Sequence, residues 1–120
     1  MIREVIKTIK DGDYKGLAAL FSVRSNYSDF MPNTIGRNDY HIYGRKSIEM
    51  FFQNKLFFHE MVITNVEYES ETSANYLAVY NGENLHAQMR IENIDNKGKI
   101  KRLVVRPTAG EFAKYVNPID

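Results

Sequence analysis

The sequence predicts an α+β domain in which three N-terminal helices pack on a mostly antiparallel sheet. Three observations support this fold class: apolar residues recur at helical spacing up to Leu56, apolar and polar residues alternate after it, and turn residues then follow at short intervals. A chain of 120 residues is long enough for one domain and too short for two. Helices and strands are therefore expected to share a single core.

The first two helices are short and closely linked. Apolar residues follow helical spacing over residues 2–9, and Gly12 can adopt the left-handed conformation that ends a helix. Asp13 is a typical N-cap for a second helix, which places Leu17 and Phe21 on one stripe. The N-terminus is thus expected to form a helical hairpin.

The segment 22–43 is rich in Asn, Ser, Asp and Gly, and we interpret it as a loop with one short strand at about residues 39–43. A third helix is expected to begin after Gly44. Its core-facing residues would be Ile48, Phe51, Phe52 and Leu56.

Residues after Phe57 predict an antiparallel meander, because β-branched and aromatic residues dominate and neighbouring segments are joined by turns. Asn81-Gly82 suits a tight hairpin, and residues 95–98 suit a slightly longer one. The expected strands cover 58–69, 73–81, 85–94 and 99–106. A C-terminal extension, 108–120, carries a small helical stripe at Phe112, Tyr115 and Val116.

Composition excludes several classes of function. A net charge of +1 argues against partners held by charge alone, such as nucleic acid or anionic lipid. The chain has no cysteine, which excludes disulfides and thiolate metal sites and fits a reducing compartment. We find no metal-binding or phosphate-loop motif, no signal peptide and no membrane-spanning run, so no cofactor, no membrane and a cytoplasmic location are expected.

Several short motifs occur in a characteristic order: residues 10–14, Tyr27-Ser28-Asp29, Gly44-Arg45 and the two hairpins. In this order and spacing the chain resembles the nuclear transport factor 2-like superfamily, which includes ketosteroid isomerase, scytalone dehydratase and the SnoaL-like polyketide cyclases. The resemblance implies a strongly curved sheet that forms a cone with the helices. It also implies a ligand pocket at the open end and homodimers formed through the sheets.

The resemblance makes Asp29 the first catalytic candidate, since it occupies the position of the general base in ketosteroid-isomerase-like members. A carboxylate facing an apolar cavity would have a raised pKa, which suits that role. Alternatively, Asp29 is a loop residue that forms an Asx-turn or caps a helix. The two donors of the isomerase oxyanion hole are replaced by Glu4 and Arg90, which argues against a true ketosteroid isomerase.

The same alignment turns Arg90, His86 and Gln88 into the cone and predicts a polar interior that binds acidic ligands. The apolar stripe on the other face of that strand would then lie on the outer sheet surface and need a partner subunit as cover. A register shifted by one residue would instead turn the stripe inward and leave Arg90 in solvent. The stripe consists of Leu85, Ala87, Met89 and Ile91.

Further candidates are residues that could assist Asp29 or line the pocket. Tyr76 and Tyr80 share one strand face and could donate hydrogen bonds to a ligand or belong to the core. His41 is a candidate ligand-binding residue, although scattered histidines more commonly lie on strand surfaces. We expect Phe57 and Phe58 to be structural.

Three functions remain open from the sequence. The protein could be a metal-free isomerase, dehydratase or cyclase in which Asp29 acts with Arg90, His86 or Tyr80 on a small polar or acidic molecule. It could be a non-catalytic ligand-binding protein of the same fold. It could also be a dimeric interaction module whose cone is filled by its own side chains.

Overall fold

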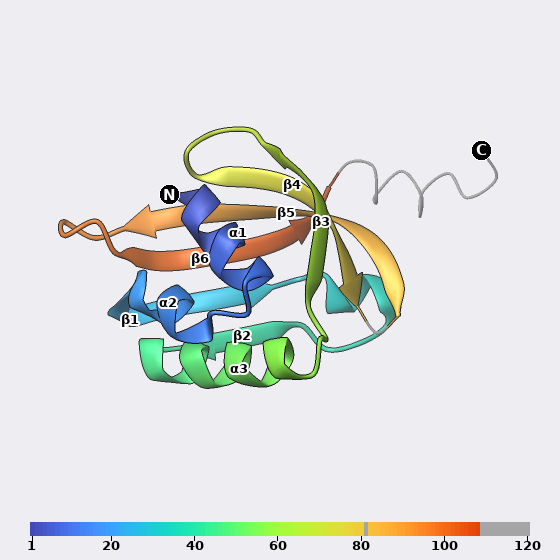
Figure 1. Cartoon of the computed structure of the whole chain (residues 1–120), viewed down its shortest axis with the longest axis horizontal. Helices are drawn as coiled ribbons and strands as arrows, with labels where there is room; N and C mark the ends of the chain where they lie inside the picture. Colours follow the sequence, from blue (N-terminus) through green and yellow to red (C-terminus); the bar gives the residue numbers. More distant parts are fainter. Residues whose placement is uncertain (81, 109–120) are drawn as a thin grey trace.

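The computed structural model describes residues 1–80 and 82–108 (Figure 1). The helices are α1 (Ile2–Lys10), α2 (Tyr14–Ala19), the 3₁₀ helix η1 (Pro32–Ile35) and α3 (Arg45–Phe57). The strands are β1 (Phe21–Asp29), β2 (Tyr40–Tyr43), β3 (Val62–Tyr68), β4 (Ser73–Tyr80), β5 (Glu83–Ile94) and β6 (Ile100–Pro107). The prediction for the tail after Thr108 lies outside the described residues.

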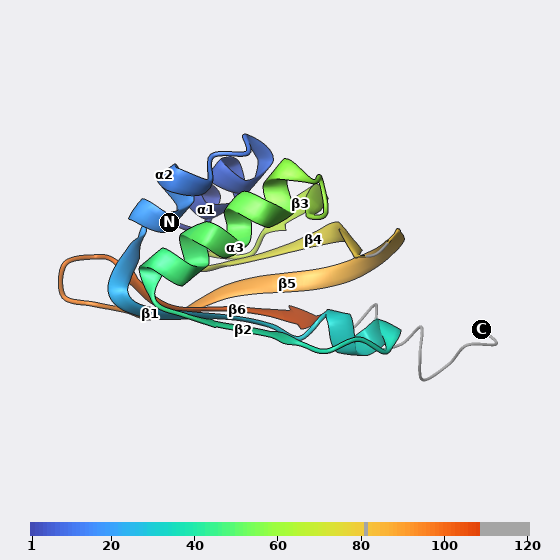
Figure 2. The same cartoon turned by 90° about the horizontal axis from the view of Figure 1, so that it is seen from below.

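The six strands form one sheet in the order β2-β1-β6-β5-β4-β3. Every neighbouring pair is antiparallel except β1 and β6, which run parallel. The sheet is curved and unclosed, and α1, α2 and α3 all lie on its concave side (Figure 2). The predicted α+β architecture is therefore confirmed.

The helices begin where the local chemistry predicts, but α2 ends at Ala19, so Phe21, which was expected on its stripe, is the first residue of β1. Asp13 caps α2 by accepting a hydrogen bond from the Gly16 N–H at 2.9 Å. Gly12 has a φ of 71° in the link between α1 and α2, a conformation that costs glycine little. All four apolar residues of the α1 stripe are buried in the core, as are Ile48 and Phe52 of α3.

Strand β1 was missed by the sequence analysis, which assigned residues 22–43 mainly to loop. The strand is polar over most of its length, so it lacks the apolar alternation that indicates strands. Its hydrogen bonds nevertheless have partners on both sides, in β2 and β6. Asp29 thus lies at the end of a strand inside the sheet rather than in an exposed loop.

The expected orientation of β5 was also wrong. Leu85, Ala87, Met89 and Ile91 are buried against the helices, whereas Arg90 is exposed on the outer face. Burying four apolar side chains stabilises the fold, while desolvating an unpaired guanidinium would cost several kcal/mol. The interior is therefore apolar at this strand, and the polar cavity around Arg90 is not formed.

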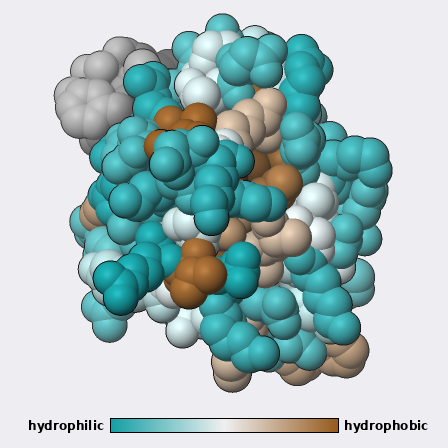
Figure 3. Space-filling model, turned by 90° about the vertical axis from the view of Figure 1, so that its left-hand side faces the viewer, coloured by the Kyte–Doolittle hydropathy of each residue, from teal (hydrophilic) through white to brown (hydrophobic). Residues whose placement is uncertain are grey.

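The side of the molecule that includes the β5–β6 hairpin is mostly hydrophilic, with smaller hydrophobic areas between the polar residues (Figure 3). In the part of the chain that the structure describes, no helix is long and apolar enough to cross a membrane. The largest exposed apolar side chains on a helix are Met50 and Phe57 of α3, next to Phe58 at its C-terminal cap.

Candidate functional site

Asp29 is fully buried and holds three hydrogen bonds from the chain itself. The Tyr80 hydroxyl donates to Asp29 Oδ2 at 2.6 Å, and the Tyr27 hydroxyl donates to the same oxygen at 2.9 Å. The Met31 N–H donates to Oδ1 at 2.9 Å, a contact with the spacing of an Asx-turn. The position of Asp29 thus combines the two roles that the sequence left open: it starts a turn, and it faces the interior.

Burial raises the pKa of Asp29 above its ordinary value of 3.8, although the hydrogen bonds from Tyr80, Met31 and Tyr27 oppose this shift. Burial also raises the pKa values of Tyr27 and Tyr80 well above the ordinary range, and the nearby Asp29 carboxylate adds to the effect. The tyrosines therefore remain protonated donors. Of the three groups, Asp29 is the one whose pKa is shifted upward from the acidic range, which suits a proton acceptor.

A pocket of about 440 Å³ opens beside this cluster. Its lining comes from the loop after η1, the start of β2, the end of α3 with the turn that follows, and the end of β4 with the β4–β5 turn (Figure 1). Apolar and polar side chains both contribute. The lining residues are Arg37, Tyr40, Lys55, His59, Glu60, Met61, Val79, Tyr80 and Gly82.

Tyr80 connects the pocket to the buried carboxylate. Among the described residues, it alone both lines the pocket and hydrogen-bonds to Asp29. Asp29 does not line the pocket. A ligand would therefore meet Tyr80, and Asp29 would act on it through Tyr80.

Lys55 supplies a half-buried cation to the same pocket. Its Nζ donates to the Tyr40 hydroxyl at 3.0 Å and to Glu60 Oε2 at 2.9 Å, and it lies 4.7 Å from the centre of the Tyr40 ring. Burial by itself lowers the pKa of Lys55, but the hydrogen bonds to Tyr40 and Glu60 outweigh it, and the pKa lies above its ordinary value. The amine is therefore a stable cation rather than a nucleophile.

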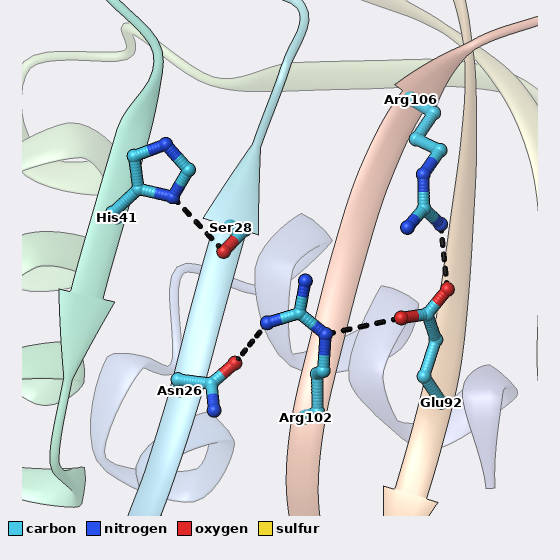
Figure 4. A network of polar contacts seen from close by, with 6 residues as sticks. All are labelled: Asn26, Ser28, His41, Glu92, Arg102 and Arg106. Carbon is cyan, nitrogen blue, oxygen red and sulfur yellow. Dashed lines mark hydrogen bonds and ion pairs between the residues drawn. The ribbon is translucent and has the colours of Figure 1, made fainter.

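The outer face of the sheet carries a separate polar network (Figure 4). Arg102 donates to Glu92 at 3.0 Å and to Asn26 at 2.6 Å, and Arg106 donates to Glu92 at 2.6 Å. On the neighbouring strands, Ser28 and His41 are 3.2 Å apart. These residues point away from the face that carries Asp29, so they do not contribute to its surroundings.

The predicted site residues divide between the two faces. Asp29, Tyr76 and Tyr80 come together inside, where burial raises the pKa of the Tyr76 hydroxyl and the nearby Asp29 carboxylate adds to the shift. Arg90, His86, Gln88 and His41 lie on the outer face, and Gln88 donates to Glu69 at 2.6 Å. The expected placement of Arg90, His86 and Gln88 in the cone was wrong, because β5 turns its other residues inward, and the exposed His41 agrees with the strand-surface alternative.

Several residues of the site were missed, among them Tyr27, Arg37, Lys55 and Glu60. Tyr27 stands two positions before Asp29, which is the spacing of side chains on one face of a strand, so it could have been found once β1 was recognised. Arg37, Lys55 and Glu60 carry no such local signal. Only the tertiary fold brings them to the mouth of one pocket.

The described part of the chain was also searched for a metal-binding group of side chains. Within residues 1–80 and 82–108, no three His, Cys, Asp or Glu side chains gather in a group that could hold a metal ion.

No family model matches the chain, and a sequence search of curated proteins finds no relative. Solved structures are similar in fold. A protein from Sphaerobacter thermophilus has a TM-score of 0.66 and 14% identity, with 89% of this chain and 92% of that one covered. A SnoaL-like protein of unknown function from Burkholderia thailandensis has a TM-score of 0.60 and 10% identity, with coverage of 89% and 91%.

A third similar structure is a nuclear transport factor 2-like protein of unknown function from Cytophaga hutchinsonii. It has a TM-score of 0.58 and 14% identity, and the match covers 92% of this chain and 89% of that one. The chain therefore has the nuclear transport factor 2-like fold that the sequence resemblance predicted. At these identities the likeness extends to the fold alone and leaves activity and ligand to the site itself.

Proposed function

We propose that the protein binds a small polar molecule in the pocket beside Tyr80 and that Tyr80 and Asp29 move a proton to and from it. The supporting observation is that Tyr80 lines the pocket and donates to the buried Asp29 carboxylate at 2.6 Å. Two further donors hold Asp29 in place. This preorganisation suits proton transfer, because no group has to reorient before the reaction.

The proposed step is proton abstraction beside a carbonyl. The ligand proton passes to the Tyr80 oxygen while the Tyr80 proton passes to Asp29 Oδ2, and the electron pair of the broken C–H bond stays on the ligand as an enolate. Return of the proton at another atom gives an isomerisation, and loss of hydroxide, as water, from the neighbouring carbon gives a dehydration. These reaction types match those that the sequence resemblance implies, with Tyr80 as the contacting group in place of Asp29.

A test of this function uses ethyl acetoacetate as a probe with an acidic C–H bond. Deuterium uptake from D₂O, followed by NMR, should be faster with the protein than with buffer alone. Asp29→Asn and Tyr80→Phe should each return the rate to that of buffer, while Tyr43→Phe, at an exposed tyrosine on β2, should leave it unchanged. Equal rates for the parent protein and Tyr80→Phe would contradict the proposed relay.

A second candidate function is a dimeric interaction module. The specific observation in its favour is the exposed apolar surface of α3, where Phe57 is 74% exposed and Met50 62% exposed. The homodimer remains a prediction, now without the outer apolar stripe on β5 that first suggested it. Sedimentation at micromolar concentration should give about twice the chain mass, and Phe57→Ser should restore a monomer if α3 forms the contact.

A further inference from the structure

The pocket carries more positive charge than its own carboxylate neutralises. Arg37 and Lys55 both line it, and among the described residues Glu60 is the one acidic residue of the lining. Glu60 already pairs with Lys55. Among the described residues, Arg37 has no hydrogen-bond or ion-pair partner for its guanidinium, so one cation at the mouth of the pocket is unneutralised.

The chain holds the Lys55 amine in place and fixes the backbone from which the Arg37 side chain extends. Lys55 is held by the Tyr40 hydroxyl and stacks over the Tyr40 ring, so its amine has little freedom to leave the pocket. Arg37 follows Gly36, which ends η1 in the left-handed conformation, and the Arg37 N–H donates to the Pro32 carbonyl at 2.9 Å. The held Lys55 amine lowers the entropy cost of binding an anion in the pocket.

The Glu60 carboxylate pairs with the Lys55 amine at a position that a ligand carboxylate could take instead. Its side chain is 51% exposed, compared with 21% for Lys55, so the ion pair faces solvent on the carboxylate side. A solvent-exposed pair of this kind contributes little net stability, and its carboxylate can be exchanged for another at small cost. The Glu60 carboxylate thus marks where a ligand oxyanion would lie.

We propose that the pocket selects ligands that carry a carboxylate, bound jointly by Arg37 and Lys55, and that Glu60 occupies this position on Lys55 until the ligand displaces it. The inference rests on the proposed function and names the class of its ligand. A guanidinium matches a carboxylate with two parallel hydrogen bonds, while the ammonium group adds a point charge. Met61 and Val79 offer apolar surface for the body of the ligand, and Tyr80 offers a hydroxyl to its far oxygen.

The test compares 4-hydroxybenzoate with its neutral counterpart 4-hydroxybenzamide, using the amide NMR signals of Met61, Val79 and Gly82 as reporters. The parent protein should bind the acid roughly tenfold more tightly than the amide, as expected for charge-assisted hydrogen bonds. Arg37→Gln and Lys55→Met should each bring the two affinities within about twofold of each other. Arg45→Gln is the matched control, because Arg45 lies at the other end of α3, about 15 Å along the helix.

Glu60→Gln provides a result that a folding defect could not imitate. Removing the competing carboxylate should tighten binding of 4-hydroxybenzoate about threefold or more and leave the amide unchanged. If both probes bind equally well to the parent protein, the carboxylate selectivity is refuted while the pocket stands. If neither probe shifts the three reporter signals, both this inference and the proposed function fail.

Discussion

The Tyr80 hydroxyl lies 2.6 Å from Asp29 Oδ2, although the two residues are 51 positions apart in the chain. Asp29 ends β1 and Tyr80 ends β4, and three sheet positions separate these strands. The curvature of the sheet brings the two strand ends together across its concave side. The contact closes the interior and leaves Tyr80 between Asp29 and the pocket.

The stabilising contribution of Asp29 should fall as the pH rises. Burial raises its pKa in the folded protein above the ordinary value of 3.8, so the folded state binds the proton more tightly than the unfolded chain does. Its contribution is therefore complete below the unfolded pKa and is lost as the pH rises through the folded pKa. Urea unfolding from about pH 4 to about pH 8 should show the parent protein losing stability relative to Asp29→Asn. A parent protein that instead gains stability relative to Asp29→Asn as the pH rises would contradict this prediction.

Tyr27→Phe should destabilise the protein by about 1 to 3 kcal/mol, because the buried Asp29 loses one of its donors. The ring itself can stay in place, packed 5.0 Å from Phe52 between centroids. Loss of this hydrogen bond should also raise the pKa of Asp29 further, which ¹³C NMR titration of the carboxyl group would measure. Since Tyr27 does not line the pocket, probe binding should not change, unlike in Tyr80→Phe. Weaker binding in Tyr27→Phe would overturn this division of roles.

Sequence patterns predicted those elements whose residues repeat with one clear period. The apolar stripe of α1 and the turn at residues 95–98 were both found from the sequence, and Asp95 accepts hydrogen bonds from the Lys97 and Lys99 N–H groups in that turn. Strand β1 could not be found in this way, because polar residues dominate it and its stability comes from two neighbouring strands. Its recognition needs pairing information that a single sequence does not hold.

The face of β5 could have been predicted and was not. Its apolar stripe alternates with polar residues, which by itself indicates an inward stripe and an outward Arg90. The resemblance to ketosteroid isomerase suggested the opposite, because it placed Arg90 at a catalytic position. The apolar stripe was the stronger physical evidence, since burial of those side chains is worth several kcal/mol. Tyr80 and Asp29 were found as separate candidates, but their contact follows only from the folded sheet.

Phe52→Ala should cost about 3 to 5 kcal/mol, because Phe52 is fully buried between α3 and β1. Phe57→Ala should stay within about 0.5 kcal/mol of the parent protein, since its side chain is 74% exposed and contacts mainly the Phe58 ring. Phe57 and Phe58, which were expected to be structural, are both largely exposed at the C-terminal end of α3. Urea titration of the two variants measures both values. Similar losses in the two would argue against this position of α3.

His59 should tolerate glycine and reject a β-branched residue. It has a φ of 53° in the turn that ends α3, where its N–H donates to the Leu56 carbonyl and the Glu60 N–H donates to the Lys55 carbonyl. Glycine relieves the left-handed strain but loses more entropy on folding, so His59→Gly should be stabilising by roughly 0.5 kcal/mol. His59→Val should be destabilising by about 1 to 2 kcal/mol, because its branched side chain crowds this conformation.

Substitution of His59 should also affect the pocket, because His59 lies directly before Glu60. Since the turn holds Glu60 next to Lys55, His59→Val should also loosen the Lys55–Glu60 pair, which lies at 2.9 Å in the structure. Thermal unfolding measures the stability change, and the ¹⁵N NMR signal of the Lys55 ammonium reports on the ion pair. The matched control is Asn65→Val, because Asn65 also has a positive φ of 52° but does not line this pocket. Asn65→Val should lose stability and leave the NMR signal of the Lys55 ammonium unchanged. If that signal changes equally in His59→Val and Asn65→Val, a specific role of the α3–β3 turn is refuted.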